Sequence, residues 1–201
     1  SIVFSPDGTR IATAHEDNTV LIHDNTGKNI GEPLDHEAPV LSVVFSADGK
    51  FILPLASASD DKIIHISDIR QLHSSNPIQY KLVGHTEAVT CIQYSPDGTR
   101  LISGSTDCTI RLWDTTTREI IATISTNSPV QCLVVSRSGH QIACGSNEGS
   151  IQVWDANTGE QSEVINCGDY EGSISAIVFA PDGRRLLSGS TDGEVHVWEL
   201  L

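Results

Sequence analysis

The sequence predicts an all-β domain made of one small unit repeated five times, and three observations lead to this prediction. A turn of the Ser-Pro-Asp-Gly type recurs at Gly8, Gly49, Gly98, Gly139 and Gly183. Its spacings are 41, 49, 41 and 44 residues, and a strand ends 16 residues after the glycine in four copies and 19 residues after it in the second. Helical periodicity is absent, whereas short β-branched and aromatic segments alternate with turn residues. A repeat of this length is typical of a propeller blade, which must stack on its neighbours because it cannot bury its own faces.

The third copy shows each element most clearly. Val89–Ser95 is predicted to be the first strand, and Pro96–Thr99 a hairpin turn in which Asp-Gly supplies the positive backbone angles. Leu101–Ser105 and Thr109–Asp114 follow as strands two and three, since β-branched and aromatic residues fill them. Glu119–Ser125 is less apolar, as expected of a fourth strand at the outer edge of a blade.

The other copies follow the same frame. Their first strands are predicted at Leu41–Ser46, Val130–Ser136 and Ile174–Ala180, and the chain opens with the remnant Ile2–Ser5. The fifth copy ends just after its third strand, so nineteen strands are expected. We expect one domain over residues 1–201, with blades at about 1–34, 35–83, 84–125, 126–166 and 167–201.

Composition and charge limit the possible functions. The chain is 38% hydrophobic and 19% charged, the balance of an ordinary globular domain, with no apolar run long enough to cross a membrane. Its net charge of −14 argues against direct binding to nucleic acid, whose phosphates need clustered lysine and arginine. Twelve of the 26 acidic residues fall at repeated turn or strand-end positions, so much of the acidity is architectural.

Cysteine and histidine patterns predict neither disulfides nor metal binding. The five cysteines are an odd number without a Cys-x-x-Cys pair, which favours reduced thiols and an intracellular location, cytoplasmic or nuclear. The histidines show no metal-ligand spacing, and no phosphate-binding loop is present, so no cofactor is expected.

The third copy also carries a family resemblance. It contains Gly84-His85, then Ser95-Pro96-Asp97-Gly98, then a strand ending Ser103-Gly104-Ser105-Thr106-Asp107, and then Ile110-Arg111-Leu112-Trp113-Asp114. These phrases resemble the WD-repeat β-propeller family, and the resemblance extends over the whole chain. It implies four-stranded antiparallel blades around a channel, most often seven of them. We therefore expect an incomplete arc of a larger, seven-bladed propeller, with a closed five-bladed ring as the alternative.

The resemblance also implies a structural tetrad of buried, hydrogen-bonded residues. In the third copy it would consist of His85, Ser103, Asp107 and Trp113. The second copy retains His36, Ser57 and Asp61, and the fifth retains Ser188, Asp192 and Trp198. Serine, histidine and aspartate together also suggest a nucleophilic triad. Partial recurrence at one phase of the repeat favours the structural interpretation, so no catalytic residues are predicted.

The resemblance favours a non-catalytic scaffold, a subunit of a multiprotein complex that binds proteins or peptides through loops on one face. The candidate partner-binding residues on that face are Glu16, Asp60, Thr106, Asn147, Thr191, Glu37, Glu87 and Glu171. Together they predict an acidic or polar rim suited to a basic peptide.

Two alternatives stay open. One is an enzyme or small-ligand propeller that uses its central channel. The other is a sensor or regulatory arm of a larger signalling protein, because Gly31-Glu32-Pro33-Leu34 and Trp154–Glu160 resemble linkers in the repeat arrays of NACHT-type proteins.

Overall fold

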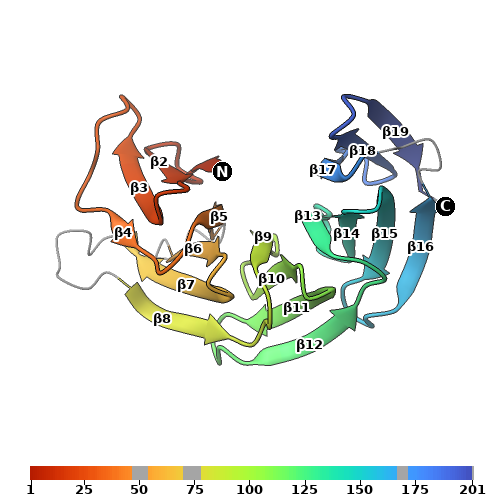
Figure 1. The fold of residues 1–201 in the computed structure, drawn as a ribbon, viewed down its shortest axis with the longest axis horizontal. Helices are drawn as coiled ribbons and strands as arrows, with labels where there is room; N and C mark the ends of the chain where they lie inside the picture. Colours follow the sequence, from red (N-terminus) through yellow and green to blue (C-terminus); the bar gives the residue numbers. More distant parts are fainter. Residues whose placement is uncertain (47–53, 70–77, 167–171, 201) are drawn as a thin grey trace.

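A computed structural model of the chain describes residues 1–46, 54–69, 78–166 and 172–200. These residues form five antiparallel sheets and contain no α-helix. The sheets, which we call blades 1 to 5, stand side by side in an open arc with their first strands toward the centre (Figure 1). The prediction of an all-β, incomplete propeller with about five blades is therefore confirmed.

Within each blade the strands pair in sequence order. Blade 1 contains β1 (Ile2–Phe4), β2 (Arg10–Ala14), β3 (Thr19–Asp24) and β4 (Leu34–Asp35). Blade 2 contains β5 (Val40–Phe45), β6 (Pro54–Ser59), β7 (Ile63–Asp68) and β8 (Ile78–Val83). Blade 3 contains β9 (Val89–Tyr94), β10 (Arg100–Ser105), β11 (Thr109–Asp114) and β12 (Ile120–Ser125). Blade 4 contains β13 (Val130–Val135), β14 (Gln141–Ser146), β15 (Ser150–Asp155) and β16 (Gln161–Asn166). Blade 5 contains β17 (Ile174–Phe179), β18 (Arg185–Ser190) and β19 (Val195–Glu199).

The Ser-Pro-Asp-Gly turns form for a local reason. In blade 3 the Gly98 N–H donates to the Ser95 carbonyl at 2.9 Å, and Gly98 has a φ of 69°, which glycine adopts without strain. Asp97 does not share that positive angle. Its carboxylate instead accepts from the Ser95 hydroxyl at 2.6 Å and from the Thr99 N–H at 3.1 Å. The aspartate therefore holds the turn through its side chain, and the glycine alone supplies the unusual backbone angle.

The hydrophobic core lies between the blades. We call the side of a blade that packs on the following blade its forward face, and the side that packs on the preceding blade its rear face. Between blades 3 and 4, Ile110 and Leu112 on the forward face pack with Val130, Ile142 and Trp154 on the rear face. Similar clusters join the other neighbouring blades. Each blade therefore depends on its neighbour for burial, as a stacked repeat requires.

A glycine in the second strand lets successive blades approach closely. A Cβ atom placed on Gly104 would lie 2.5 Å from Val130 of blade 4, and one on Gly145 would lie 2.5 Å from Ile174 of blade 5. Both distances are too short for non-bonded carbon atoms. The missing side chain of each glycine thus leaves room for a β-branched residue at the start of the first strand of the next blade.

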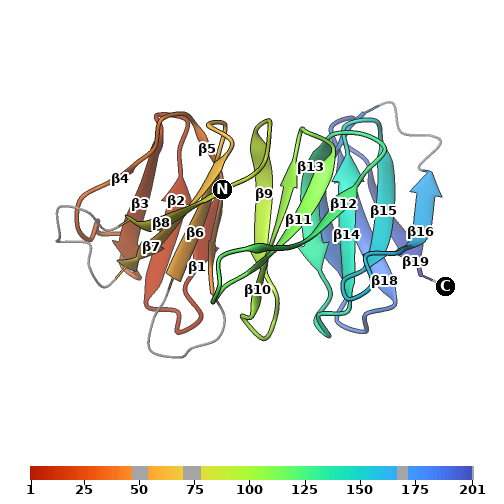
Figure 2. The ribbon, with the colours of Figure 1, turned by 90° about the horizontal axis from the view of Figure 1, so that it is seen from below.

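The strands run between two loop faces, seen edge-on in Figure 2. One face carries the Ser-Pro-Asp-Gly turns. The other, which we call the loop face, carries the loops that enter each first strand and the turns between second and third strands. Seven of the eight candidate partner-binding residues lie in these loops and turns; Glu171 is outside the described residues.

Candidate functional site on the loop face

A chain of hydrogen bonds under the loop face links two strands of blade 3, β10 and β11, to the loop before β9 and the turn before β11. The Trp113 indole N–H donates to Ser103 Oγ at 2.8 Å, and Ser103 Oγ lies 2.7 Å from His85 Nε2. His85 Nδ1 lies 2.8 Å from Asp107 Oδ2. A carboxylate can only accept, so Nδ1 carries the imidazole proton and the Ser103 hydroxyl donates to Nε2. All donors therefore point one way, from the tryptophan to the aspartate.

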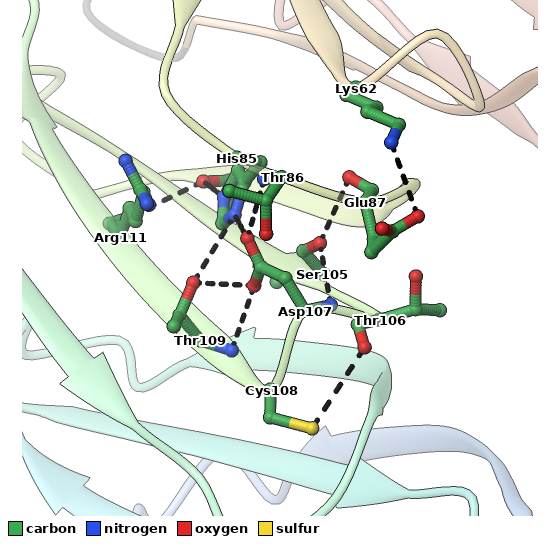
Figure 3. A network of polar contacts seen from close by, with 12 residues as sticks. Lys62, His85, Thr86, Glu87, Ser105, Thr106, Asp107, Cys108, Thr109 and Arg111 are labelled. Carbon is green, nitrogen blue, oxygen red and sulfur yellow. Dashed lines mark hydrogen bonds and ion pairs between the residues drawn. The ribbon is translucent and has the colours of Figure 1, made fainter.

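The Asp107 carboxylate ends this chain and holds the turn above it. It accepts from the Thr86 N–H at 3.0 Å, the Thr109 N–H at 2.9 Å and the Thr109 hydroxyl at 2.6 Å, as well as from His85 (Figure 3). Burial acts to raise its pKa, but these bonds outweigh burial and lower the pKa to about 2. Asp107 is thus a carboxylate at neutral pH that ties the loop before β9 to the turn before β11.

Ser103, His85 and Asp107 have the connectivity of a nucleophilic triad, so burial decides between catalysis and structure. Ser103 has 0% exposure, and its oxygen already accepts from Trp113. The side chains of His85 and Asp107 are 1% and 4% exposed. The Ser103 hydroxyl is therefore enclosed, and its hydrogen bonds form a cross-link within the blade.

Blade 2 organises the equivalent residues differently. The hydroxyl of Ser57 contacts His36 Nε2 at 2.8 Å, but His36 Nδ1 turns to the Leu34 carbonyl at 3.2 Å instead of to Asp61. The His36 ring stacks on that of His65, with centroids 4.3 Å apart. The predicted set is therefore only partly brought together. The sequence reasoning missed His65, whose place in the repeat is that of the half-buried Arg111 in blade 3.

Several polar atoms in blade 2 are buried without hydrogen-bond partners. They are Asp61 Oδ2, both ring nitrogens of His65 and Ser67 Oγ. Burial lowers the pKa of His65 to about 4, with a further contribution from neighbouring His36. Ser67 occupies the position of Trp113, so blade 2 lacks the indole that completes the network in blade 3.

The remaining blades keep parts of the network. In blade 5 the Trp198 indole donates to Ser188 Oγ at 2.8 Å, while Asp192 accepts from the Ser190 hydroxyl. In blade 4 a cysteine, Cys144, replaces the serine, and the buried Trp154 indole N–H has no hydrogen-bond partner.

Backbone hydrogen bonds bring the candidate residues of the loop face together blade by blade. The N–H groups of Asp60, Thr106, Asn147 and Thr191 donate at 3.0 to 3.2 Å to carbonyls in the loops that enter the first strands. Each turn is thereby fixed beside its loop. Six candidates are exposed on this face, and Thr106 is half-buried; the exposed ones are Glu16, Glu37, Asp60, Glu87, Asn147 and Thr191. Glu171 lies outside the described residues.

Lysines neutralise part of the predicted acidic rim. Lys62 of blade 2 lies 3.3 Å from Glu87 of blade 3, and Lys81 lies 3.7 Å from Glu37. Figure 3 shows the first of these pairs beside Thr106. Glu16 and Asp60 have no ion pair within the described part of the chain. Among the candidate acids that the structure describes, Glu16 and Asp60, on blades 1 and 2, are therefore the ones whose charge is not paired with a lysine.

A cavity opens at the centre of the arc, at the end opposite the loop face. It has a volume of about 460 Å³ and lies where the inner strands meet the Ser-Pro-Asp-Gly turns, lined by Phe45, Tyr94, Val135, Phe179 and similar apolar residues. The charged side chain in this lining is that of Arg137. The side-chain oxygen of Gln93 accepts a hydrogen bond from the Val135 N–H at 2.8 Å. Among the described residues that line it, none is an acid that could share a proton with a base.

Metal-binding clusters and membrane-spanning helices are both absent from the part of the chain that the structure describes. No group of three or more histidine, cysteine or acidic side chains is placed to hold a metal ion. No helix among these residues has the length and hydrophobicity needed to cross a membrane.

Comparison with known proteins agrees with this geometry. The family described as WD domain, G-beta repeat, matches residues 1–24, 27–68, 76–114, 118–155 and 162–199. The COMPASS component SWD3 of Saccharomyces cerevisiae is 32% identical over 126 residues, covering 62% of this chain and 37% of the relative. The Poly(A)+ RNA export protein of Schizosaccharomyces pombe is 35% identical over 130 residues, covering 62% and 35%. Pre-mRNA-processing factor 19 of Caenorhabditis elegans is 30% identical over 123 residues, covering 61% and 24%.

The chain thus spans little more than a third, at most, of the length of these relatives. The family match, in contrast, covers each of the five blades. The chain belongs to the WD40-repeat family of β-propeller proteins.

Proposed function

We propose that this chain is a non-catalytic scaffold that binds a protein or peptide through its loop face and works as part of a multiprotein complex. The observation that supports this most is the way blade 3 holds its loops. Asp107 joins the loop containing Thr86 to the turn containing Thr109, beneath the exposed Glu87 and half-buried Thr106. A partner therefore meets a preorganised surface and orders few loop residues on binding.

The distribution of charge favours a basic peptide over nucleic acid. Glu16 and Asp60 are exposed acids on neighbouring blades, without ion pairs in the described residues, and the whole chain has a net charge of −14. An Arg- or Lys-containing segment gains attraction there, whereas phosphates are repelled. Lys62 and Lys81 already satisfy Glu87 and Glu37, so we assign these two acids a secondary role.

The relatives support the same class of function. One is named as a component of COMPASS, and two others are named for RNA export and pre-mRNA processing. An intracellular location, cytoplasmic or nuclear, belongs to this proposal.

The test measures binding of fluorescent peptide libraries, basic and acidic, to the full chain by polarisation at two salt concentrations. We expect basic peptides to bind and a double Glu16→Lys/Asp60→Lys variant to lose about tenfold or more in affinity. Glu160→Lys is the matched control, since Glu160 is an exposed acid in the turn after β15, at the opposite face. Equal loss in the control, or stronger binding of acidic peptides, would contradict the proposal.

A further inference from the structure

The cavity at the centre of the arc opens at the face that carries the Ser-Pro-Asp-Gly turns, which we call the turn face. Its wall includes Phe45, Tyr94 and Val135, which lie near the ends of the first strands of blades 2, 3 and 4 (Figure 1). Each of these blades packs between two neighbours, so this wall is built inside the arc. The volume of about 460 Å³ lies within the range of roughly 300 to 1,000 Å³ that is usual for ligand sites.

Side chains already occupy backbone groups at the edges of the strands beside this cavity. The Gln93 side-chain oxygen, on β9, accepts from the Val135 N–H of β13 at 2.8 Å. In the same way the Ile92 N–H of β9 donates to Ser42 Oγ of β5 at 3.3 Å. These N–H groups are not free to pair with an added strand. A ligand in the cavity is therefore recognised there by side chains.

The turn of blade 4 departs from the repeat where it meets the cavity. The two residues before its glycine are Arg137 and Ser138, whereas blades 1, 3 and 5 have proline and aspartate at these places. Ser138 still supports the turn, because its Oγ accepts from the His140 N–H at 3.3 Å. The exchange removes one negative charge and adds one positive charge beside an apolar cavity.

The charge of Arg137 is available to a ligand. Its side chain is exposed, and it has no ion pair with any residue that the structure describes. In the neighbouring turn of blade 5, Asp182 is paired with Arg185 at 2.7 Å, so its negative charge is largely neutralised. The mouth of this cavity is thus a place where a carboxylate is attracted, on a chain whose net charge is −14.

The cavity continues into a smaller polar pocket of about 170 Å³ between the turns of blades 3 and 4. Ser95 and Pro96 line both spaces. Asp97, Arg100 and His140 line the smaller one, which therefore offers donors and acceptors. An occupant of the apolar cavity can extend along the turn face with polar groups beside it. This shape suits a peptide chain better than a compact small molecule.

We propose that the turn face binds a peptide segment of a partner protein in which apolar side chains flank a single aspartate or glutamate. The apolar side chains occupy the cavity, and the carboxylate pairs with the Arg137 guanidinium, whose planar donors match a carboxylate. A run of several acids is disfavoured, because the net charge of −14 repels it. The site lies opposite the loop face and does not depend on the function proposed for that face.

The experiment measures binding of fluorescent peptides with blocked termini to the full chain by polarisation. In each peptide one aspartate is flanked on both sides by leucine or phenylalanine. We expect members of this set to bind the wild type and to lose at least about tenfold in affinity for Arg137→Glu. Because Arg137 is exposed, its substitution should leave the fold intact.

Exchanges within the peptide separate the two parts of the interaction. Lysine in place of the aspartate should reverse the preference, so that this peptide binds Arg137→Glu more tightly than it binds the wild type. Serine in place of the apolar residues should abolish binding to both proteins, because little apolar area is then buried. A serine peptide that binds as well as its parent would overturn the proposal.

Arg184→Glu is the matched control, because Arg184 is an exposed arginine on the turn face of blade 5 that lies outside the lining of the cavity. It should bind the aspartate peptides like the wild type. The double Glu16→Lys/Asp60→Lys variant, altered on the loop face, should bind them no more weakly than the wild type. A loss in Arg184→Glu equal to that in Arg137→Glu would assign the effect to net charge, and a loss in the double variant would place the peptide on the loop face. Either result overturns the proposal.

Two further outcomes would also overturn it. One is that no peptide of the set binds the wild type. The other is that Arg137→Glu keeps its affinity for the aspartate peptide and gains none for the lysine peptide. Failure of basic peptides to bind, in contrast, counts against the loop-face function alone, because those peptides report on the opposite face.

Discussion

Replacing Asp107 by alanine tests whether the network of blade 3 stabilises the protein. The substitution removes the acceptor of four hydrogen bonds, two from Thr109 and one each from Thr86 and His85. Thr86 is exposed and Thr109 half-buried, so water can replace the carboxylate at those donors. His85 is buried, and its Nδ1–H keeps at best the long contact to Thr109 Oγ1 at 3.2 Å.

The expected loss of stability follows from this contrast between the donors that water can reach and the buried donor of His85. Leaving a buried donor without its acceptor costs about 1 to 3 kcal/mol, and bonds replaced by water add little. We therefore expect Asp107→Ala to lower the free energy of unfolding by about 2 kcal/mol. For a chain of this size that corresponds to a fall in Tm of roughly 4 to 8 °C.

The assay is calorimetry together with urea unfolding at pH 7, with Asp97→Ala as the control in the same blade. Asp97 also accepts several hydrogen bonds, but it lies in an exposed turn, so its loss should cost clearly less. The pKa of Asp107 adds a second readout. Because the pKa is lowered to about 2 in the folded protein, the carboxylate stabilises the fold above about pH 4, and this stabilisation is lost as the pH falls toward 2. A Tm for Asp107→Ala equal to that of the wild type would refute the reasoning.

Three further predictions concern other blades. Cys144→Ser should raise the free energy of unfolding by about 1 kcal/mol, because the serine hydroxyl oxygen can accept a hydrogen bond from the unpartnered Trp154 N–H. Urea unfolding measures this gain, and a lower free energy of unfolding would contradict the prediction. Gly145→Ala should lower the free energy of unfolding by about 1 to 3 kcal/mol, because the added methyl group would overlap Ile174 of the next blade. Gly189→Ala should change it by less than about 0.5 kcal/mol, because the nearest atom to its Cβ is 4.0 Å away. Equal costs would show that the close approach of the blades at Gly145 is not what requires glycine. The low pKa of buried His65, about 4, means that the fold favours its neutral form, so stability is complete above pH 6.5 and falls by roughly 3 kcal/mol as the pH drops to 4. The difference between the unfolding midpoints at pH 7.5 and 5 should therefore become smaller in His65→Gln, with a remainder from His36 and His85, whose pKa values burial also lowers. An unaltered pH dependence would argue against this.

The repeat could be derived from the sequence because its causes are local. The glycine of each turn supplies a backbone angle, β-branched segments favour strands, and both recur at one spacing. The strand bounds in blade 3 accordingly differ from the predicted ones by a single residue, for example β9 ending at Tyr94 in place of Ser95. The described residues of blade 5 form three strands, in agreement with the nineteen strands that the sequence predicts.

Side-chain partnerships within a blade were harder to predict. His36 and His65 are far apart in sequence, and only the folded blade shows that their rings stack and that Asp61 Oδ2 lies 3.5 Å from His65 Nε2 and not against His36 Nδ1. The pairing of Lys62 with Glu87 crosses from one blade to the next, so it depends on how blades 2 and 3 are placed. Such contacts depend on rotamers and distances that a residue pattern does not specify.

The sequence by itself determined the unit, its strands and the position of each apolar residue within the repeat. The tertiary structure decided which of those positions are covered. Val195 and Ile110 occupy the same place in the pattern, yet one is 72% exposed and the other 0%, because burial in this fold comes from the neighbouring blade. A periodic pattern shows which side of a strand is apolar, but only the arrangement of the blades shows what packs against it.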